Sequence, residues 1–197
     1  MNKIDLYIQE ETDIYNSEFT NENLNNLDIK NKTISKTNFE RCNVTLSNYK
    51  NIYFEKVIFS NCDLSNTKFQ KCNFKEIEFV NCKLVGVNIS ECRITKAYIK
   101  DSQCKYFNIM DTTSKELVIE QSDFTESNFY NMNHQKLLLK NTNFKETEFA
   151  NTNLSGVDFS TCDISSIKID HRSLKGIKVN QFQAIELAQI LGIEIIF

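Results

Sequence analysis

The sequence repeats with a period of five residues from Phe19 to Val179. Steps of five from Phe19 reach 33 positions, and all but two hold an aliphatic, aromatic or cysteine residue. With 41% hydrophobic residues, the chain would fill fewer than half of these positions by chance. An amphipathic helix has a period of 3.6 residues and a half-buried strand a period of two, so neither explains the pattern. One large buried residue per short unit predicts a solenoid, whose core forms because successive turns stack.

A second inward column lies two residues before each large residue. In 21 of the 33 units this position holds Ser, Thr, Cys, Ala or Val. One small and one large inward residue per unit fit a narrow and closely packed interior. The residue between them is often Asn or Asp, whose short side chain can bond to the backbone of a turn.

Units such as Cys62-Asp63-Leu64-Ser65-Asn66 and Thr152-Asn153-Leu154-Ser155-Gly156 resemble the A(D/N)Lxx repeat of the pentapeptide-repeat family. The resemblance implies an all-β fold, a right-handed quadrilateral β-helix with four units per coil and about eight coils. Residues 20 apart would then stack, as in the series Phe19, Phe39, Phe59 and Phe79. We expect the β-helix over residues 1–179, with residues 1–18 as an N-terminal cap or first coil, and a separate C-terminal segment over residues 180–197.

The C-terminal segment predicts a short helix over residues 180–191. Asn180 with Gln183 fits a capping box, Gly192 fits the position after a helix, and Ala184, Leu187, Ala188 and Leu191 form an apolar stripe. The run from Val179 to Ile195 resembles the C-terminal end of the Qnr-type quinolone-resistance proteins. That resemblance implies a two-fold homodimer and protection of DNA gyrase and topoisomerase IV. The residues expected at the dimer interface are Phe182, Ile185, Leu191, Ile193, Ile195, Ile196 and Phe197.

The two exceptions in the large column, Ser114 and His134, are 20 residues apart and are expected on one face of adjacent coils. They indicate either a polar pair buried or splayed at a coil corner, or a bulged or looped face used for recognition. Loops on a rigid scaffold often carry function. The candidate partner-binding residues are Thr112, Ser114, Lys115, Glu116, His134 and Gln135.

The net charge of −3 limits mimicry of duplex DNA by this chain. Eight coils would give a rod of roughly 38 Å, and duplex DNA of that length carries about 22 phosphate charges. Mimicry would therefore need one acidic face, for which the candidates are Asp123, Glu126, Glu146, Glu148, Asp158, Asp163 and Asp170. Direct contact through residues 110–136 requires less negative charge. Residues 41–100 carry an excess of five positive charges, which we expect to point elsewhere.

Other classes of function have less support in the sequence. No acid, base and nucleophile converge on either histidine, so we expect a protein that is not an enzyme and needs no cofactor. Six of the seven cysteines occupy the small column and Cys104 the large one, which predicts free, buried thiols without a metal.

No apolar run is long enough to span a membrane and no signal peptide is recognisable, so we expect a cytoplasmic protein. Direct nucleic-acid binding is not expected, because most phenylalanines face inward. The alternative to topoisomerase protection is a structural or interaction scaffold for an unrelated protein.

Overall fold

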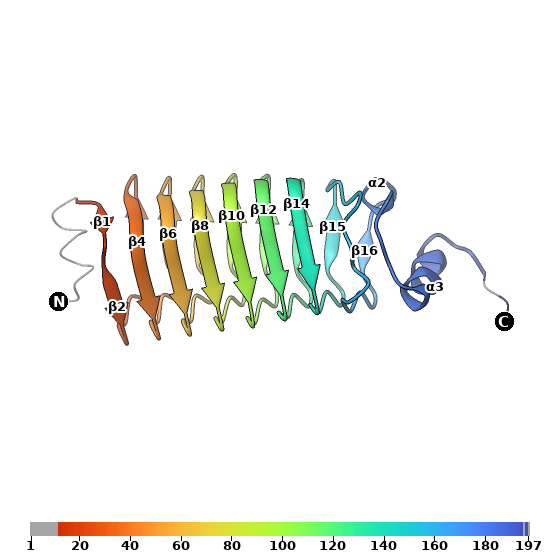
Figure 1. The fold of residues 1–197 in the computed structure, drawn as a ribbon, viewed down its shortest axis with the longest axis horizontal. Helices are drawn as coiled ribbons and strands as arrows, with labels where there is room; N and C mark the ends of the chain where they lie inside the picture. Colours follow the sequence, from red (N-terminus) through yellow and green to blue (C-terminus); the bar gives the residue numbers. More distant parts are fainter. Residues whose placement is uncertain (1–11, 195, 197) are drawn as a thin grey trace.

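The computed structural model describes residues 12–194 and 196, and over this range the chain is a parallel β-solenoid of about eight turns. It matches the right-handed β-helix that the resemblance implies, with the C-terminal helix that the capping pattern predicts (Figure 1). Paired residues are 20 apart: Ile34 pairs with Phe54, and Phe54 pairs with Phe74. The predicted coil length is confirmed. Ile195, Phe197 and most of the expected N-terminal cap lie outside the described residues.

Two parallel sheets form the walls of the solenoid. The first sheet contains β1 (Ile14–Tyr15), β2 (Glu18–Thr20), β4 (Thr33–Glu40), β6 (Tyr53–Ser60), β8 (Asn73–Val80), β10 (Arg93–Lys100), β12 (Thr113–Glu120) and β14 (Asn133–Lys140). The second sheet contains β3 (Asp28–Lys30), β5 (Asn48–Lys50), β7 (Lys68–Gln70), β9 (Asn88–Ser90), β11 (Asn108–Met110), β13 (Asn128–Tyr130), β15 (Glu148–Ala150) and β16 (Lys168–Ile169). The helices α2 (His171–Leu174) and α3 (Gln181–Ile190) follow.

Each coil has four faces, and each face receives one five-residue unit per coil. Over the six coils that contain β4, β6, β8, β10, β12 and β14, the units recur in steps of 20. The first face runs from 32–36 to 132–136, the second from 37–41 to 137–141, the third from 42–46 to 142–146 and the fourth from 47–51 to 147–151. Each long strand therefore supplies residues to the first face and then, beyond a corner, to the second.

The interior is filled by ladders of side chains from successive coils. The rings of Phe19, Phe39 and Phe59 stack with centroids 4.9 and 4.6 Å apart, and Phe79 continues the ladder at 5.3 Å. Phe129, also expected inside, is 1% exposed. Stacked aromatic pairs add stabilisation to the area that they bury. The period-five pattern therefore predicts the core correctly.

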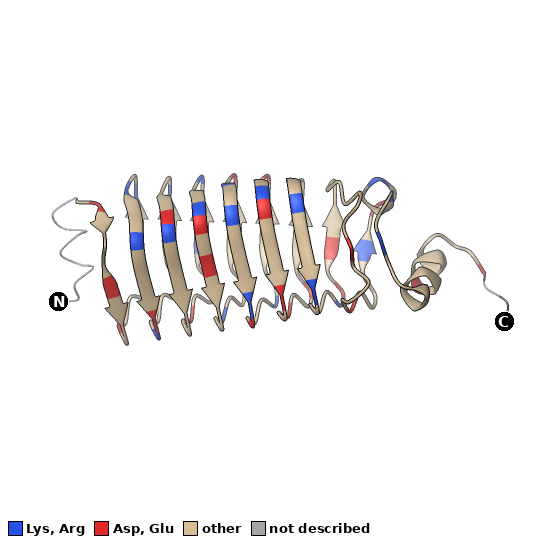
Figure 2. Cartoon of the chain, in the orientation of Figure 1, with Lys and Arg blue, Asp and Glu red and all other residues tan. Residues whose placement is uncertain are grey.

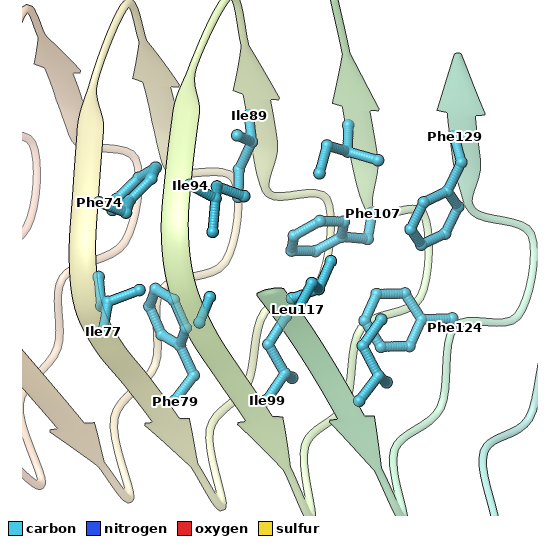
Figure 3. Close-up of a pocket in the computed structure, with 13 residues that line it drawn as sticks. Phe74, Ile77, Phe79, Ile89, Ile94, Ile99, Phe107, Leu117, Phe124 and Phe129 are labelled. Atoms are coloured by element: carbon cyan, nitrogen blue, oxygen red, sulfur yellow. The ribbon is translucent and has the colours of Figure 1, made fainter. Parts of the chain in front are cut away.

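The aromatic ladders are interrupted in the middle of the rod. From Leu84 to Ile119 the large column contains only aliphatic residues, Cys104 and Ser114, so its rings end at Phe79 and resume at Phe124. Between them the small column supplies one buried ring, that of Phe107. At this level lies an apolar cavity of about 20 Å³ (Figure 3). Its lining residues include Phe79, Ile99 and Phe124. Smaller side chains in a coil of fixed width leave this space, and a wholly apolar cavity is expected to be dry.

The third face confirms the role expected for Asn and Asp before the large residue. Asp63 Oδ1 accepts a hydrogen bond from the Ser65 N–H at 2.9 Å, and Asn143 Oδ1 accepts one from the Lys145 N–H at 2.9 Å. These local bonds satisfy backbone donors at the turns.

All seven cysteines are free and buried, which confirms their assignment to the core. Six lie at the small inward positions of the coils, and Cys104 lies at a large one. The Cys42 N–H donates to the sulfur of Cys62 in the next coil at 3.3 Å. Within the described residues, no group of three or more His, Cys, Asp or Glu side chains could hold a metal ion.

Helix α3 closes the C-terminal end of the solenoid. Asn180 and Gln183 form the expected capping box, and Gly192 has the expected positive φ of 76°. The expected apolar stripe is only partly correct, since Leu187 is buried but Ala184 and Leu191 are exposed. The other buried residue of α3 is Gln183. Its Nε2 donates hydrogen bonds to the carbonyls of Phe159 at 2.9 Å and Cys162 at 2.7 Å. A polar side chain faces inward here because the last coil leaves backbone acceptors that need donors. Neither α2 nor α3, the helices within the described residues, is long and apolar enough to cross a membrane.

Candidate partner-binding surface

The polar strip, defined here as residues 112–116 and 132–136, lies on regular strands. Ser114 pairs with His134 in β12 and β14, without any insertion between them. Within residues 110–136 the chain continues as strands and turns of normal length, so the looped face considered from the sequence is not formed. The buried polar pair is the interpretation that agrees with the structure.

The six candidate residues of the polar strip differ in accessibility. Thr112 is 0% and Ser114 4% exposed, so neither can touch a partner directly. Lys115 and Gln135 are exposed, while Glu116 and His134 are half-buried. The available surface therefore consists of the outward residues of the strip, including the ion pair between Lys136 Nζ and Glu116 Oε1 at 3.2 Å.

The corner between the first and second faces changes conformation one coil before the polar strip and keeps the new conformation through it. In three earlier coils the corner residues Lys36, Lys56 and Glu76 have left-handed backbone, with φ of 48°, 54° and 60°. The equivalent residues of the next three coils, Lys96, Glu116 and Lys136, are not among the described residues with positive φ. The pairing of β10 with β8 also shifts register on either side of Lys96. The irregularity suspected from the sequence is thus a change of corner geometry.

A surface hollow of about 260 Å³ lies beside this altered corner. Its lining contains two cationic residues, three neutral polar residues on neighbouring strands, and two inward residues. These are Arg93, Lys115, Thr113, Asn133, Gln135, Ile94 and Ser114. The hollow can accept a small polar group or an extended side chain from a partner.

The polar pair is poorly satisfied inside the coil. The Oγ of Ser114 and both ring nitrogens of His134 are buried without a hydrogen-bond partner. Burial lowers the pKa of His134, and the neighbouring backbone of Asn153 offsets this only in part. The ring therefore favours its neutral form, because charging it would require a solvent shell that the site does not supply.

Two family models match this chain in its most regular part. A model for the pentapeptide repeat region matches residues 52–123, and a model for eight copies of the pentapeptide repeat matches residues 122–165. Together they span more than half of the chain. The chain belongs to the pentapeptide-repeat family.

Solved structures of other pentapeptide-repeat proteins are similar at low sequence identity. Two trypsin-treated variants of QnrB1, a plasmid-mediated fluoroquinolone resistance protein, are 19% and 17% identical, with TM-scores of 0.46 and 0.44. They cover 94% and 93% of this chain and 100% and 99% of their own. HetL from the cyanobacterium Nostoc sp. strain PCC 7120, involved in heterocyst differentiation regulation, is 13% identical with a TM-score of 0.37, covering 90% of this chain and 96% of its own. No curated protein matches the sequence.

The acidic candidates do not share one face of the pentapeptide-repeat rod. Asp123, Glu126, Glu146 and Asp163 follow the third face, where Asp123 and Asp163 each bridge to Asn143. Glu148 lies on β15 of the fourth face, Asp158 lies on the second, and Asp170 caps α2. The third face also carries Lys105 and Lys145, which pair with Asp123 and Glu146 at 3.7 Å.

Several of these carboxylates already have a structural role. Asp163 accepts hydrogen bonds from the side chain and backbone of Ser165, which lower its pKa. Asp158 is held in the same way by Ser160, with the same direction of shift. For Asp170, burial raises the pKa, but bonds from Ser173, Asn151 and Arg172 outweigh it and leave the pKa lowered. These carboxylates are turn and cap acceptors.

The C-terminal candidates form an exposed apolar group. Phe182 is 69%, Leu191 49%, Ile193 53% and Ile196 94% exposed, whereas Ile185 is half-buried. Ile190, which the sequence reasoning omitted, is 47% exposed and is the last residue of α3, directly before Leu191. Several exposed apolar side chains in one terminal segment are typical of an interaction site.

A second apolar group was missed from the sequence. Tyr98, Val118 and Leu138 are registered neighbours on the outer side of β10, β12 and β14, on the second face beside the polar strip. Leu138 is 44% exposed, and Tyr98 and Val118 are half-buried. The sequence feature that could have revealed this group is its spacing of 20 residues, because each member stands at the outward position just before a residue of the large column.

Proposed function

We propose that this pentapeptide-repeat rod is a non-enzymatic, cytoplasmic binding protein that contacts DNA gyrase or topoisomerase IV and protects it from quinolones. The proposal rests mainly on the conformation of the C-terminal segment. The run that resembles Qnr-type proteins folds as helix α3 on the last coil and leaves Phe182, Ile190, Leu191 and Ile193 exposed. This arrangement supports a homodimer in which the same apolar patch of each copy meets at a two-fold axis.

The contact surface we propose is the corner formed by the polar strip and the apolar row of Tyr98, Val118 and Leu138. Apolar and aromatic side chains bordered by polar ones provide the anchors and the rim of a protein interface. The scatter of the acidic candidates over three faces favours direct contact over imitation of duplex DNA. Thr112, Ser114 and His134 would contribute by setting the shape of the corner, while Lys115, Glu116 and Gln135 meet the partner.

The test is a gyrase supercoiling and topoisomerase IV decatenation assay with a fluoroquinolone. We expect the purified protein to restore activity without altering the drug. Leu138→Lys should abolish protection, because it places a charge in the apolar row. Ile58→Lys is the matched control, since Ile58 occupies the same outward position four coils earlier and is 37% exposed. Equal protection by both variants would remove this corner from the interface. Failure of the unmodified protein with both enzymes would favour a scaffold for another partner.

Dimerisation has a separate test. We expect Phe182→Glu with Ile193→Glu to convert the dimer to a monomer in light scattering, because both side chains are exposed on the C-terminal patch. A wild-type protein that is already monomeric over a broad concentration range would contradict this part of the proposal.

A further inference from the structure

The positive charges of the rod are collected on one face. Over its six units the first face carries eight Lys or Arg residues and three carboxylates. Each of the other three faces carries at least as many carboxylates as cations over the same coils. Figure 2 shows these cations as bands on the first halves of the long strands. In the sequence this separation is hidden, because consecutive units belong to different faces.

Part of this charge is neutralised within the face, and part is free. Lys75 pairs with Glu55 at 2.7 Å, and Lys136 pairs with Glu116 at 3.2 Å. Four exposed cations have no ion pair or hydrogen bond within the described residues. They are Lys56, Arg93, Lys96 and Lys115. Three of these belong to the adjacent strands β10 and β12, beside the surface hollow that Arg93 and Lys115 line. The free charge is therefore concentrated at one place.

The neutral residues of the first face indicate which kind of partner it can bind. Its outward positions hold hydroxyl and amide side chains between the cations, among them Thr95, Thr113, Asn133 and Gln135. Among these described outward positions the one aromatic residue is Tyr53, which is half-buried, and there is no exposed aliphatic residue. A protein interface requires apolar anchors, which the second face offers and the first does not. Lys and Arg interspersed with Ser, Thr, Asn and Gln are the groups that contact phosphate and sugar.

We propose that the first face binds the phosphate backbone of duplex nucleic acid, without sequence preference and with its strongest contacts at Arg93, Lys96 and Lys115. A duplex is favoured over a single strand because single-strand binding uses exposed aromatic side chains for base stacking. The six units extend over about 24 Å at the spacing of neighbouring strands, and a duplex of that length carries about 14 phosphates on its two strands. A straight face of this length meets several phosphates of one duplex. The binding goes beyond the proposed topoisomerase contact, with which it shares Lys115 of the polar strip, and does not depend on it.

The test is fluorescence anisotropy of the full-length protein with a labelled duplex of about 20 base pairs, between about 50 and 200 mM salt. A single strand of the same length and a labelled poly-glutamate peptide are the comparison probes. We expect the duplex to bind best. Its affinity should fall steeply as salt is raised, because lysine and arginine side chains that neutralise phosphates release the counterions condensed on the duplex.

Two triple variants remove the same charge from different faces. The test variant combines Arg93→Ala, Lys96→Ala and Lys115→Ala. The control combines Lys50→Ala, Lys68→Ala and Lys71→Ala on the exposed fourth face. The test variant should weaken duplex binding at least about tenfold and reduce the salt slope by up to about 2.7, since each phosphate contact contributes about 0.9. The control should retain most of the affinity and slope.

Circular dichroism checks that both variants are folded. If the triple test variant is not folded, the single charge reversal Lys115→Glu replaces it in the binding assay. Equal losses in the two triple variants would show a net-charge effect and overturn the proposal. It is also overturned if no duplex binds at about 50 mM salt, or if poly-glutamate binds more tightly than the duplex, which would indicate an acidic protein partner.

Discussion

Replacing His134 by leucine should stabilise the protein, although His134 is one of its two histidines and a candidate contact residue. The position belongs to the large inward column, where leucine already stands at Leu154 in the next coil. Neither ring nitrogen of His134 has a hydrogen-bond partner in its buried position. Leucine removes these unsatisfied groups and has a similar volume. The inward column then holds an apolar residue at this position as well.

The expected gain follows from the cost of the unsatisfied groups. A buried polar group without a partner costs about 1–3 kcal/mol. We take about 2 kcal/mol for His134→Leu, the middle of this range. For a protein of this size that gain raises Tm by about 4–8 °C.

The effect should also depend on pH with a definite sign. Burial lowers the folded-state pKa of His134 below its ordinary value of 6.5. The neutral ring's contribution to stability is complete above that value. It is lost as pH falls towards the folded pKa, because the unfolded chain takes up the proton first. Wild-type stability should therefore fall between about pH 7.5 and pH 5.5 by more than that of His134→Leu.

Urea unfolding followed by circular dichroism at these two pH values measures both effects. Ser114→Val is the matched control, because it also removes an unpartnered buried oxygen in the adjacent coil but no titratable group. It should raise stability equally at both pH values. The reasoning fails if His134→Leu is less stable than wild type, or if its stability changes with pH as much as that of the wild type.

Three further predictions concern the core and the cap. Phe79→Ala should destabilise the protein by about 3–5 kcal/mol in urea unfolding, because it removes a buried ring from a stack; a loss below about 1 kcal/mol would contradict the ladder. Gln183→Leu should cost about 1–3 kcal/mol, because the carbonyls of Phe159 and Cys162 lose their donor. An unchanged midpoint would show that α3 does not stabilise the last coil. All seven cysteines should react with an alkylating reagent only after denaturation, as intact mass will show, and rapid labelling of the native protein would refute their burial.

Much of the fold could be predicted from the sequence because burial is decided within each five-residue unit. Phe59 and Cys62 face inward whichever coil lies above or below them, so the repeat alone identifies them as core residues. The capping box of Asn180 and Gln183 is equally local, because both residues act within one turn of helix. The break in the column at Ser114 and His134 also coincides with buried polar atoms that lack hydrogen-bond partners.

The tertiary structure decided which outward residues share a surface. Arg93, Lys96 and Lys115 come together only when units 20 residues apart stack, and the acidic candidates separate for the same reason. The altered corner at Glu116 and the exposure of Leu191 likewise depend on the neighbouring coils. Five-residue periodicity fixes what points inward, because every unit meets the same narrow interior. The outer surface follows from the number of units in a coil and from the geometry of its corners, which are set by contacts between residues distant in sequence.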